Sequence, residues 1–452
     1  MRISIIGTGY VGLVSGTCLA SCGHSLICVD IRSDVVEKIN RGVAPIYELD
    51  LEPLLIKVVK SGNLRATTDL TSAVRGSDVT LICVGTPTVG GEADLSQLKT
   101  AATAVGAALV EKGGYHVVVV KSTVLPGTTE GVVKAAVEES SGKHLGSGWG
   151  LCMNPEFLRE GRAVEDFNAP DRIVIGATDQ KAATVALGMY EQFDCPKLVT
   201  SPRTAEMIKY VSNSLLATLI SFSNEIANLC ATTQGVDARE VWKGVHLDRR
   251  LTPARADREH PPGVVEYLWH GLGFGGSCFP KDVAALRGFG QKAGVPTAML
   301  DAVLAINALQ PMQVVSLLEQ EINPKGRTIA ILGLAFKPGT DDLRHSPALP
   351  VIRALQERGA TVVVHDPIAM PGAKQDPIMK EAVFASSWQA ALKNADACCL
   401  ITSWPEYKDI RPPDVLRLMK TPVVIDGRGL FDPAEFMAAG IRWRGIGYTP
   451  AK

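Results

Sequence analysis

Apolar and polar positions in the first part of the chain alternate between strand-like and helix-like patterns. The run RISIIG leads into a glycine-rich turn, GTGYVG, and a helical stretch follows over residues 13–22. Further strand-like runs lie at residues 25–31, 77–87 and 115–124, followed by WGLCMNP and DRIVIGA. Strands separated by helices are typical of a doubly wound parallel sheet, so we expect an α/β domain over residues 1–200.

The pattern changes after Ser201-Pro202, a pair that favours the start of a helix. No proline or glycine then interrupts the chain until Gly235, so we predict one long helix over residues 203–234. Helix-like sequence continues beyond it and defines a central helical domain over residues 201–322. The apolar length of its first helix indicates the core of a homodimer or a larger homo-oligomer.

A second strand–turn–helix series follows a linker at residues 323–326. Its strand-like runs are TIAILGLAF, ATVVVHDP, ADACCLITSW and TPVVIDGR, and it contains no GxGxxG motif. Each half of the chain places an acid at the end of a strand, Asp30 in the first and Asp366 in the second. We therefore predict a second Rossmann-like domain over residues 323–452, joined to the first by the long helix and a helical connector.

Composition narrows the class of protein. The chain has 452 residues, too many for one ordinary core, with 46% hydrophobic and 21% charged residues, a balance typical of globular proteins. The formal net charge of -1 argues against a nucleic-acid surface, so an anionic ligand would need local cations. We expect no leader and no apolar run of membrane-spanning length. Ten cysteines without metal or disulfide spacing indicate reduced thiols, no metal and a cytoplasmic protein.

The glycine-rich turn predicts a dinucleotide site because of its context. A strand precedes it, a helix follows it, and Asp30 lies 23 residues after Gly7 at the end of the next strand. Gly7 would allow the tight turn, Gly9 the approach of the backbone to a pyrophosphate, and Gly12 close packing of the helix. Asp30 would bind the ribose hydroxyls and repel a 2′-phosphate, which favours NAD over NADP. The alternative is a generic strand–turn–helix.

Two threonines follow later strands, at the edge where open parallel sheets bind their ligands. Thr86 lies in VGTPT and Thr123 in STVLPGTT. Both are candidate lining residues of the cofactor site, and each would suit an ordinary strand-end turn equally well.

Four segments carry chemically useful groups. Glu156 follows a proline in MNPEFLREG, and Lys209 and Asn213 lie four residues apart, on one face of the long helix. Cys278 lies in GFGGSCFPKD, and the fourth segment is FKPGTDDLRHSP. The alternative interpretations are a turn acid for Glu156 and a solvated stripe for Lys209 and Asn213.

Cys278 suits a hydrophobic core poorly, because its neighbours are glycines and a serine. An adjacent lysine and a nearby helix start would favour its thiolate form. A nucleophilic thiol in an NAD enzyme indicates trapping of an aldehyde as a hemithioacetal. Loss of hydride then leaves a thioester, which water cleaves to an acid.

Six motifs together resemble the nucleotide-sugar 6-dehydrogenases of the UDP-glucose/GDP-mannose dehydrogenase family. They are GTGYVG, STVLPGTT, NPEFLREG, GFGGSCFPKD, LGLAFKPGTDDLRHSP and IDGRG, and they occur in the family's order over essentially the whole chain. The resemblance implies a four-electron, NAD-dependent oxidation of a sugar C6 alcohol to a carboxylate, without a metal. PDRIVIG and FLREG resemble the UDP-glucose branch, which implies conversion of UDP-glucose to UDP-glucuronate. GDP-mannose, a UDP-N-acetylhexosamine or a TDP-sugar is the alternative substrate.

The resemblance also implies catalytic roles. Cys278 would be the nucleophile, and Lys209 with Asn213 would stabilise the oxyanion. Asp282 would position the base or the water, while Glu156 with Thr123 would assist hydrolysis of the thioester.

Binding residues form two sets. The predicted cofactor contacts are Gly7, Gly9, Tyr10, Val11, Gly12, Asp30, Thr86 and Thr123, and the resemblance adds Arg344. The nucleotide-sugar contacts implied by the resemblance are Phe157, Leu158, Glu160, Lys209, Asn213, Arg250, Tyr267, Gly275, Lys337 and Arg428. Lys337 and Arg428 would face the diphosphate, which needs local cations on a protein of this net charge.

One segment departs from the family pattern. Sixteen residues, 251–266, separate Arg250 from Tyr267-Leu268, where the family has a short gap. Arg250 resembles the family arginine that reaches the substrate of a neighbouring subunit, and the longer gap leaves its placement open. The charges of the segment and Pro261-Pro262 favour a solvent-facing insertion.

Two other classes of function are compatible with a cofactor fingerprint. One is a dehydrogenase that stops after a single hydride transfer, for which Cys278 would be dispensable. The other is a non-catalytic sensor of NAD or a nucleotide sugar. The joint presence of a thiol, a lysine and two acids in the motifs argues against a sensor.

Overall fold

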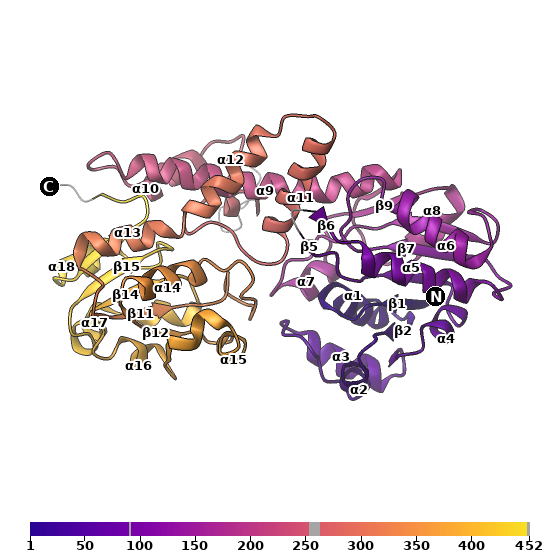
Figure 1. Ribbon diagram of the computed structural model, residues 1–452, viewed down its shortest axis with the longest axis horizontal. Coiled ribbons are helices and arrows are strands. Elements are labelled where there is room, and N and C mark those ends of the chain that lie inside the picture. The colour runs from indigo at the N-terminus through magenta and orange to yellow at the C-terminus, as the bar shows by residue number, and fades with distance from the viewer. Residues whose placement is uncertain (90–91, 253–262, 450–452) are drawn as a thin grey trace. The chain divides into compact units, whose positions relative to one another are not determined.

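A computed structural model describes residues 1–89, 92–252 and 263–449 (Figure 1). The chain forms two compact units, Met1–Ser212 and Asn213–Lys452. Each unit contains one large, mainly parallel sheet with helices between its strands. The predicted fold class, two Rossmann-like α/β sheets with a long helix between them in the sequence, is confirmed.

The first sheet has the strand order β10-β9-β8-β7-β4-β1-β2-β3. Its strands are β1 (Arg2–Ile6), β2 (Ser25–Val29), β3 (Leu64–Thr67), β4 (Val79–Ile82), β7 (His116–Val120), β8 (Trp149–Met153), β9 (Ile173–Ala177) and β10 (Lys197–Thr200). β1 pairs in parallel with both β2 and β4, so the order of the strands reverses direction at β1. Open parallel sheets bind their ligands at such a topological switch point. β9 runs antiparallel to β8, and β5 (Thr88–Val89) and β6 (Glu92–Ala93) form a separate hairpin.

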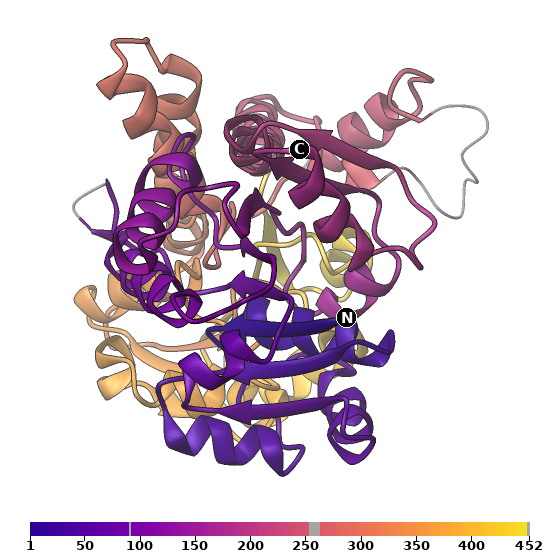
Figure 2. The same ribbon diagram turned by 90° about the vertical axis from the view of Figure 1, so that its right-hand side faces the viewer.

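Helices cover both faces of this sheet (Figure 2). They are α1 (Tyr10–Ser21), α2 (Ser33–Asn40), α3 (Leu51–Lys60), α4 (Leu70–Arg75), α5 (Ser96–Leu109), the π-helical η1 (Thr129–Val133), α6 (Lys134–Ser141), α7 (Ala163–Asn168) and α8 (Gln180–Gly188). Strand residues alternate between two cores: Ile3 and Ile5 pack with α1 and α3, whereas Ile6 packs with α4 and α5. This alternation keeps the apolar strands buried on both sides.

One long helix, α9 (Pro202–Cys230), has 29 residues and confirms the prediction of a single long helix here, although it ends at Cys230 and not at residue 234. The other helices of the connector are α10 (Ala238–His246), η2 (Gly263–Tyr267), α11 (Phe279–Lys292), α12 (Ala298–Leu309) and α13 (Met312–Glu321). The division between the two units falls inside α9, after Ser212. Pro202 occupies the first position of α9, where its missing N–H costs no hydrogen bond.

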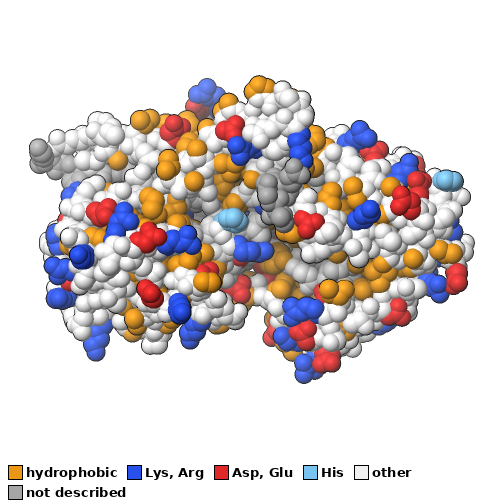
Figure 3. All heavy atoms as spheres, in the orientation of Figure 1, with side chains coloured by type: hydrophobic (Ala, Val, Ile, Leu, Met, Phe, Trp, Pro, Cys, Tyr) orange, Lys and Arg blue, Asp and Glu red, His pale blue; other side chains and the backbone are white. Residues whose placement is uncertain are grey.

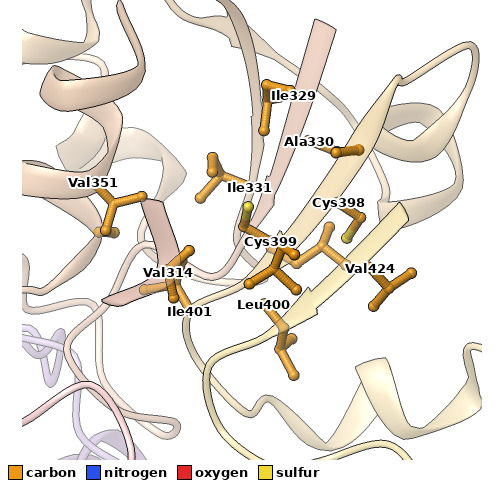
Figure 4. Close-up of a cluster of buried hydrophobic side chains, with 14 of the residues drawn as sticks. Val314, Ile329, Ala330, Ile331, Val351, Cys398, Cys399, Leu400, Ile401 and Val424 are labelled. Atoms are coloured by element: carbon orange, nitrogen blue, oxygen red, sulfur yellow. The ribbon is translucent and has the colours of Figure 1, made fainter. Parts of the chain in front are cut away.

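The second sheet has six parallel strands in the order β13-β12-β11-β14-β15-β16. They are β11 (Thr328–Leu332), β12 (Thr361–His365), β13 (Val383–Phe384), β14 (Ala397–Leu400), β15 (Val423–Asp426) and β16 (Arg442–Gly445). Its helices are α14 (Ala348–Glu357), α15 (Met370–Ala373), η3 (Pro377–Glu381), α16 (Trp388–Leu392), η4 (Pro405–Asp409), α17 (Pro412–Leu418) and α18 (Pro433–Ala438). Figure 4 shows its core, where Ile331 and Cys399 lie with Val314 and Val351.

One expectation from the sequence was wrong. Ala298–Glu321, which comprises α12, a turn and α13, has the length and apolar composition of a membrane span, with a mean hydropathy of 1.3 over its most apolar window. Pro311 and the fully buried Gln310 interrupt it between the two helices. Val314, Val315 and Leu318 of α13 pack into the core of the second sheet. Helices that pack against a sheet can reach this hydropathy without meeting a membrane.

Candidate active site

The glycine-rich turn has the backbone geometry that a dinucleotide needs. Gly7 has a φ of 94°, a region that favours glycine, and Gly9 is the N-cap of α1. A Cβ on Gly12 would lie 1.9 Å from the Gly7 carbonyl oxygen, whereas a Cβ on Gly9 would meet no protein atom within 4 Å. Gly12 must therefore be glycine for the helix to pack against the turn. The space beside Gly9, at the N-terminus of α1, is open to a pyrophosphate.

Asp30 lies half-buried just after β2 and supports this turn. One carboxylate oxygen accepts hydrogen bonds from the Thr8 hydroxyl at 2.5 Å and the Thr8 N–H at 3.2 Å. The other accepts the Arg32 N–H at 3.0 Å. Since an ionised carboxylate has about four acceptor positions, Asp30 keeps capacity for ribose hydroxyls. The residues present therefore fit NAD.

The remaining predicted cofactor contacts of the first unit adjoin this turn. The Thr86 hydroxyl donates to the Thr123 carbonyl at 2.8 Å, so the structure brings these two strand-end threonines together. Tyr10 and Val11 open α1 and are half-buried. The Tyr10 hydroxyl donates to Glu48, whose carboxylate also accepts the Gly161 N–H at 2.7 Å. Glu48 was not predicted, and it connects the cofactor turn to the segment NPEFLREG.

A buried ion pair lies at the start of that segment. Lys209 Nζ is 2.8 Å from Glu156 Oε1, and the two side chains are 3% and 6% exposed. The other Glu156 oxygen accepts the Leu158 N–H at 2.7 Å. Burial by itself raises the pKa of Glu156, but the Lys209 ammonium, the Leu158 N–H and Lys121 outweigh it and hold that pKa below its ordinary value. Burial contradicts the alternative of a solvated stripe for Lys209 and Asn213, which are 3% and 7% exposed.

The ring of Phe157 lies near two cations. The Arg172 guanidinium lies 3.9 Å from its ring centroid and Lys209 Nζ lies 5.6 Å from it. Glu160 follows on the same segment, half-buried. The structure therefore gathers Glu156, Phe157 and Lys209 in one place within the first unit.

The thiol of Cys278 lies at the N-terminus of a helix in the second unit. Cys278 is the N-cap residue of α11, and its side chain is half-buried. This end of a helix carries a partial positive charge, which favours a thiolate. The Ser277 hydroxyl lies 3.5 Å from the Cys278 sulfur. The predicted helix start next to the thiol is thus present.

The glycines before the thiol pack against the loop after β11. The Gly276 N–H donates to the Arg344 carbonyl at 2.8 Å, and Gly276 has a φ of 79°. A Cβ on Gly275 would lie 2.4 Å from the His345 carbonyl oxygen and 2.9 Å from the Phe336 Cβ. Only glycine permits this approach, which joins GFGGSCFPKD to FKPGTDDLRHSP within the second unit.

Asn213 and Asp282 form a second polar contact near the thiol. Asn213 Nδ2 donates to Asp282 Oδ2 at 2.6 Å, and Lys281 Nζ lies 2.6 Å from the other oxygen. Asp282 is 1% exposed and lies on the first turn of α11, so its N–H also bonds the Cys278 carbonyl at 2.9 Å. The structure thus gathers Cys278, Asn213 and Asp282.

The cations predicted to face a diphosphate follow strands of the second sheet. Arg428 follows β15, with Nε 2.6 Å from the Ile401 carbonyl. Burial lowers its pKa to about 10. Lys337 follows β11, and its Nζ lies 5.6 Å from the Phe336 ring centroid. Arg344 pairs with Asp342 at 2.8 Å and is 64% exposed.

Arg250 and Tyr267 flank the departure from the family pattern. Arg250 is 89% exposed and pairs with Asp248 at 2.5 Å, a contact that lowers the pKa of Asp248 to about 2. Tyr267 ends η2, and its ring centroid lies 6.2 Å from that of Phe279. Residues 253–262 of the longer segment lie outside the described residues.

A buried lysine was missed by the sequence reasoning. Lys121 directly follows β7 and is 4% exposed, with Nζ 2.9 Å from Asn154 Oδ1. The Tyr190 hydroxyl donates to the same oxygen at 2.6 Å. The sequence does contain a signal for Lys121, since a charged residue directly follows four valines. Parallel strands of this kind end at the edge of the sheet where ligands bind, so a charge placed there is a candidate site residue. Among the described residues, no group of three or more His, Cys, Asp or Glu could hold a metal ion.

Fold and site together define an NAD-dependent oxidoreductase with two α/β sheets. Family models match the chain in three consecutive parts: the NAD binding domain at residues 1–194, the central domain at 203–309 and the UDP binding domain at 330–433 of the UDP-glucose/GDP-mannose dehydrogenase family.

Similar proteins cover the whole chain. The UDP-glucose 6-dehydrogenase TuaD of Bacillus subtilis is 44% identical over 99% of this chain and 93% of its own length. A solved UDP-glucose dehydrogenase from Pyrobaculum islandicum has a TM-score of 0.89 and 42% identity, covering 99% of this chain and 98% of its own. A UDP-D-ManNAc dehydrogenase from Pyrococcus horikoshii has a TM-score of 0.84 and 30% identity, with 99% of each chain covered.

The chain belongs to the UDP-glucose/GDP-mannose dehydrogenase family. It is accordingly an enzyme, an NAD-dependent dehydrogenase of nucleotide sugars. The family, the enzyme class and the cofactor expected from the sequence are confirmed.

Proposed function

We propose that this chain oxidises the C6 alcohol of UDP-glucose to the carboxylate of UDP-glucuronate. The observation that carries the proposal is the thiol of Cys278 at the N-terminus of α11, on a glycine loop fixed by several contacts. Relatives named UDP-glucose 6-dehydrogenases at 44% and 39% identity support the substrate. NAD, when bound, supplies the hydride acceptor, and one sugar consumes two NAD+ and one water.

The chemistry divides among the predicted residues. After C6 has lost a hydride and its hydroxyl group a proton, the Cys278 sulfur adds to the resulting aldehyde carbon, and the carbonyl oxygen takes a proton to give a hemithioacetal. Lys209 and Asn213 stabilise negative charge on that oxygen. Loss of the second hydride from C6 and of the hydroxyl proton leaves a thioester.

Water then cleaves the carbon–sulfur bond, which returns the thiolate and releases the carboxylate. Glu156 and Thr123 assist this hydrolysis, and Asp282, held by Asn213 and Lys281, positions the base or the water. The low pKa of Glu156 keeps it a carboxylate at neutral pH.

The substrate and cofactor contacts complete the proposal. The nucleotide sugar is bound by Phe157, Leu158, Glu160, Lys209, Asn213, Tyr267, Gly275, Lys337 and Arg428. The cofactor is bound by the glycine-rich turn, Asp30, Thr86, Thr123 and Arg344. We place the domain boundaries at 1–200, 201–322 and 323–452, which are similar to the ranges matched by the three family models.

We also propose a homodimer or a larger homo-oligomer. Leu215, Phe222 and Leu229 recur every seven residues on α9 and are 55%, 50% and 60% exposed, a stripe typical of helix pairing. Hydrophobic side chains also gather at the surface around α12 (Figure 3). Arg250, which is 89% exposed, would reach the substrate of the neighbouring subunit. Phe222→Glu should lower the mass measured by light scattering, and an unchanged mass would contradict this interface.

The test of the reaction is the yield of NADH per sugar. Wild type should form two NADH per UDP-glucose, and Cys278→Ser should lose complete oxidation, while Cys195→Ser, at another half-buried cysteine, should keep it. One NADH per sugar with free aldehyde would contradict the four-electron reaction, and saturable binding without turnover would favour a sensor. Equal or faster turnover of GDP-mannose, a UDP-N-acetylhexosamine or a TDP-sugar would overturn UDP-glucose as the substrate.

We place the reaction in the cytoplasm. Support comes from the ten cysteines, none of which forms a disulfide in the part of the chain that the structure describes, as expected in a reducing compartment. Recovery of the activity from the periplasmic or membrane fraction of the source cells would contradict this.

A further inference from the structure

A side-chain amide on α12 holds the backbone of the thiol loop from both sides. Asn307 Oδ1 accepts the Phe274 N–H at 2.7 Å, and Asn307 Nδ2 donates to the Phe274 carbonyl at 3.0 Å. A Cβ on Gly273 would lie 2.3 Å from Asn307 Oδ1, and Gly273 has a φ of 82°. The glycine therefore provides the space in which the amide reaches the loop.

A second amide, on the C-cap residue of α12, holds the loop at its start. Gln310 is fully buried, and its Nε2 donates to the Gly271 carbonyl at 2.8 Å. Its Oε1 accepts from Asn228 Nδ2 at 3.0 Å, which fixes the orientation of the amide. Asn224 Oδ1 accepts the Gly271 N–H at 2.7 Å. Residues three apart lie on one side of a helix, and Gln310 keeps helical backbone angles, so the C-terminal end of α12 contacts the loop through both Asn307 and Gln310.

These anchors lie close to the thiol along the chain. Phe274 packs edge-to-face on Phe279, with centroids 6.0 Å apart, and Phe279 directly follows Cys278. Gly276 is fixed in turn by the Arg344 carbonyl. Short loops with both ends held have few alternative conformations, so displacement of Phe274 would carry to the sulfur.

We infer that Asn307 and Gln310 are positioning residues, which set the place of the Cys278 sulfur through the backbone of residues 271–276. The inference rests on the proposed role of Cys278 as the nucleophile. Neither amide needs to touch the substrate.

The sharpest variant is Asn307→Asp. It keeps the size of the side chain and one acceptor, but it places a carboxylate oxygen against the Phe274 carbonyl, where two acceptors repel. Misplacement of a reacting atom by about 1 Å costs on the order of 100-fold in rate, so the kcat of NADH formation should fall by about that factor. Alkylation of Cys278 by iodoacetamide should slow by about tenfold, because thiol reactivity follows the thiolate that the start of α11 favours.

The chain offers a matched control in the first unit. Asn40 binds Ala66 in the same two-sided way, with Oδ1 2.7 Å from the Ala66 nitrogen and Nδ2 3.0 Å from its carbonyl oxygen. Asn40→Asp removes the same kind of contact far from Cys278 in the sequence. Both variants should lower the unfolding midpoint, but only Asn307→Asp should lower kcat and slow alkylation, with the NAD dissociation constant unchanged within about twofold.

The readouts are the thermal midpoint, NAD titration, kcat, and carboxamidomethylation at Cys278 followed by mass spectrometry. Wild-type kcat and alkylation in Asn307→Asp, or equal losses in Asn40→Asp, would overturn the inference. If Asn307→Asp does not fold, Gln310→Glu applies the same change at Gly271 and is judged by the same readouts. Full oxidation by Cys278→Ser would instead contradict the proposed role of the thiol as the nucleophile. The alkylation rate of Cys278 in Asn307→Asp would still test whether Asn307 positions the sulfur.

Discussion

The buried pair of Lys209 and Glu156 gives a quantitative test of the first unit. Both side chains are almost inaccessible to water, at 3% and 6% exposed, with the charged atoms 2.8 Å apart. Replacing one partner leaves the other as an uncompensated charge. Lys209→Met keeps the length of the side chain without its charge, and Glu156→Gln keeps the shape of the carboxylate.

The expected loss follows from the burial of the two charges. Removal of one partner of a buried, hydrogen-bonded pair costs about 3–5 kcal/mol, whereas replacement of both costs little, since no charge is then left buried. Each single variant should therefore lower the free energy of unfolding by about that amount. The double variant should lose far less than the sum, with a coupling of about 2 kcal/mol or more.

Urea unfolding followed by circular dichroism measures this cycle, with amide hydrogen exchange of β7 and β8 to assign the loss to the first unit. Arg162→Gln with Glu165→Gln is a control pair, because it is a surface contact with side chains 50% and 61% exposed. Its coupling should be below about 1 kcal/mol. Additive losses at Lys209 and Glu156, within ~0.5 kcal/mol, would refute the argument that the two charges depend on each other.

Four further outcomes are expected. Gly12→Ala places a Cβ 1.9 Å from the Gly7 oxygen, so NAD affinity in a fluorescence titration should fall by at least about tenfold, and wild-type affinity would contradict the close packing. Asp30→Asn removes the charge that repels a 2′-phosphate, so the preference for NAD over NADP in steady-state kinetics should narrow by about tenfold. Asp366→Asn should lower the free energy of unfolding by about 2–4 kcal/mol, since the new NH2 faces backbone donors, with unchanged NAD affinity as the control. Folding lowers the pKa of Glu156 from its ordinary 4.5, so its ionised form stabilises the protein above that pH, and this stabilisation is lost as the pH falls through the lower folded pKa. In Glu156→Gln, the free energy of unfolding measured by urea titration should therefore fall less steeply with decreasing pH.

The sequence predicted what local patterns determine. The glycine spacing and Asp30 specify a strand–turn–helix without reference to the rest of the chain, and the absence of breakers specified α9. Strands β3 and β10 were not predicted from the sequence. β3 has only four residues, LRAT, in which buried and more exposed positions alternate, and β10 is largely exposed, so neither forms an apolar run. Such strands are defined by their partners more than by their own composition.

The residues of the candidate site also differ in how far the sequence could predict them. The motifs identified Glu156 and Cys278, but no pattern links Glu156 to Lys209, because the contact depends on how α9 packs beside the segment that follows β8. Asn307 was missed for a related reason: an amide on a helix is usually solvated, and only the φ of Gly273 and the space beside it reveal the contact.

The two acids at strand ends show why the position of a residue in a fold does not settle its role. Asp30 is half-buried and accepts three hydrogen bonds, from Thr8 and Arg32, which leaves capacity for a ligand. Asp366 occupies the corresponding place after β12 but is 1% exposed. It accepts four backbone N–H groups and the Trp404 indole, so its acceptor positions are filled. The second sheet therefore uses its acid to hold its own loops, and we propose that it binds the nucleotide through other groups, including the cations Lys337 after β11 and Arg428 after β15.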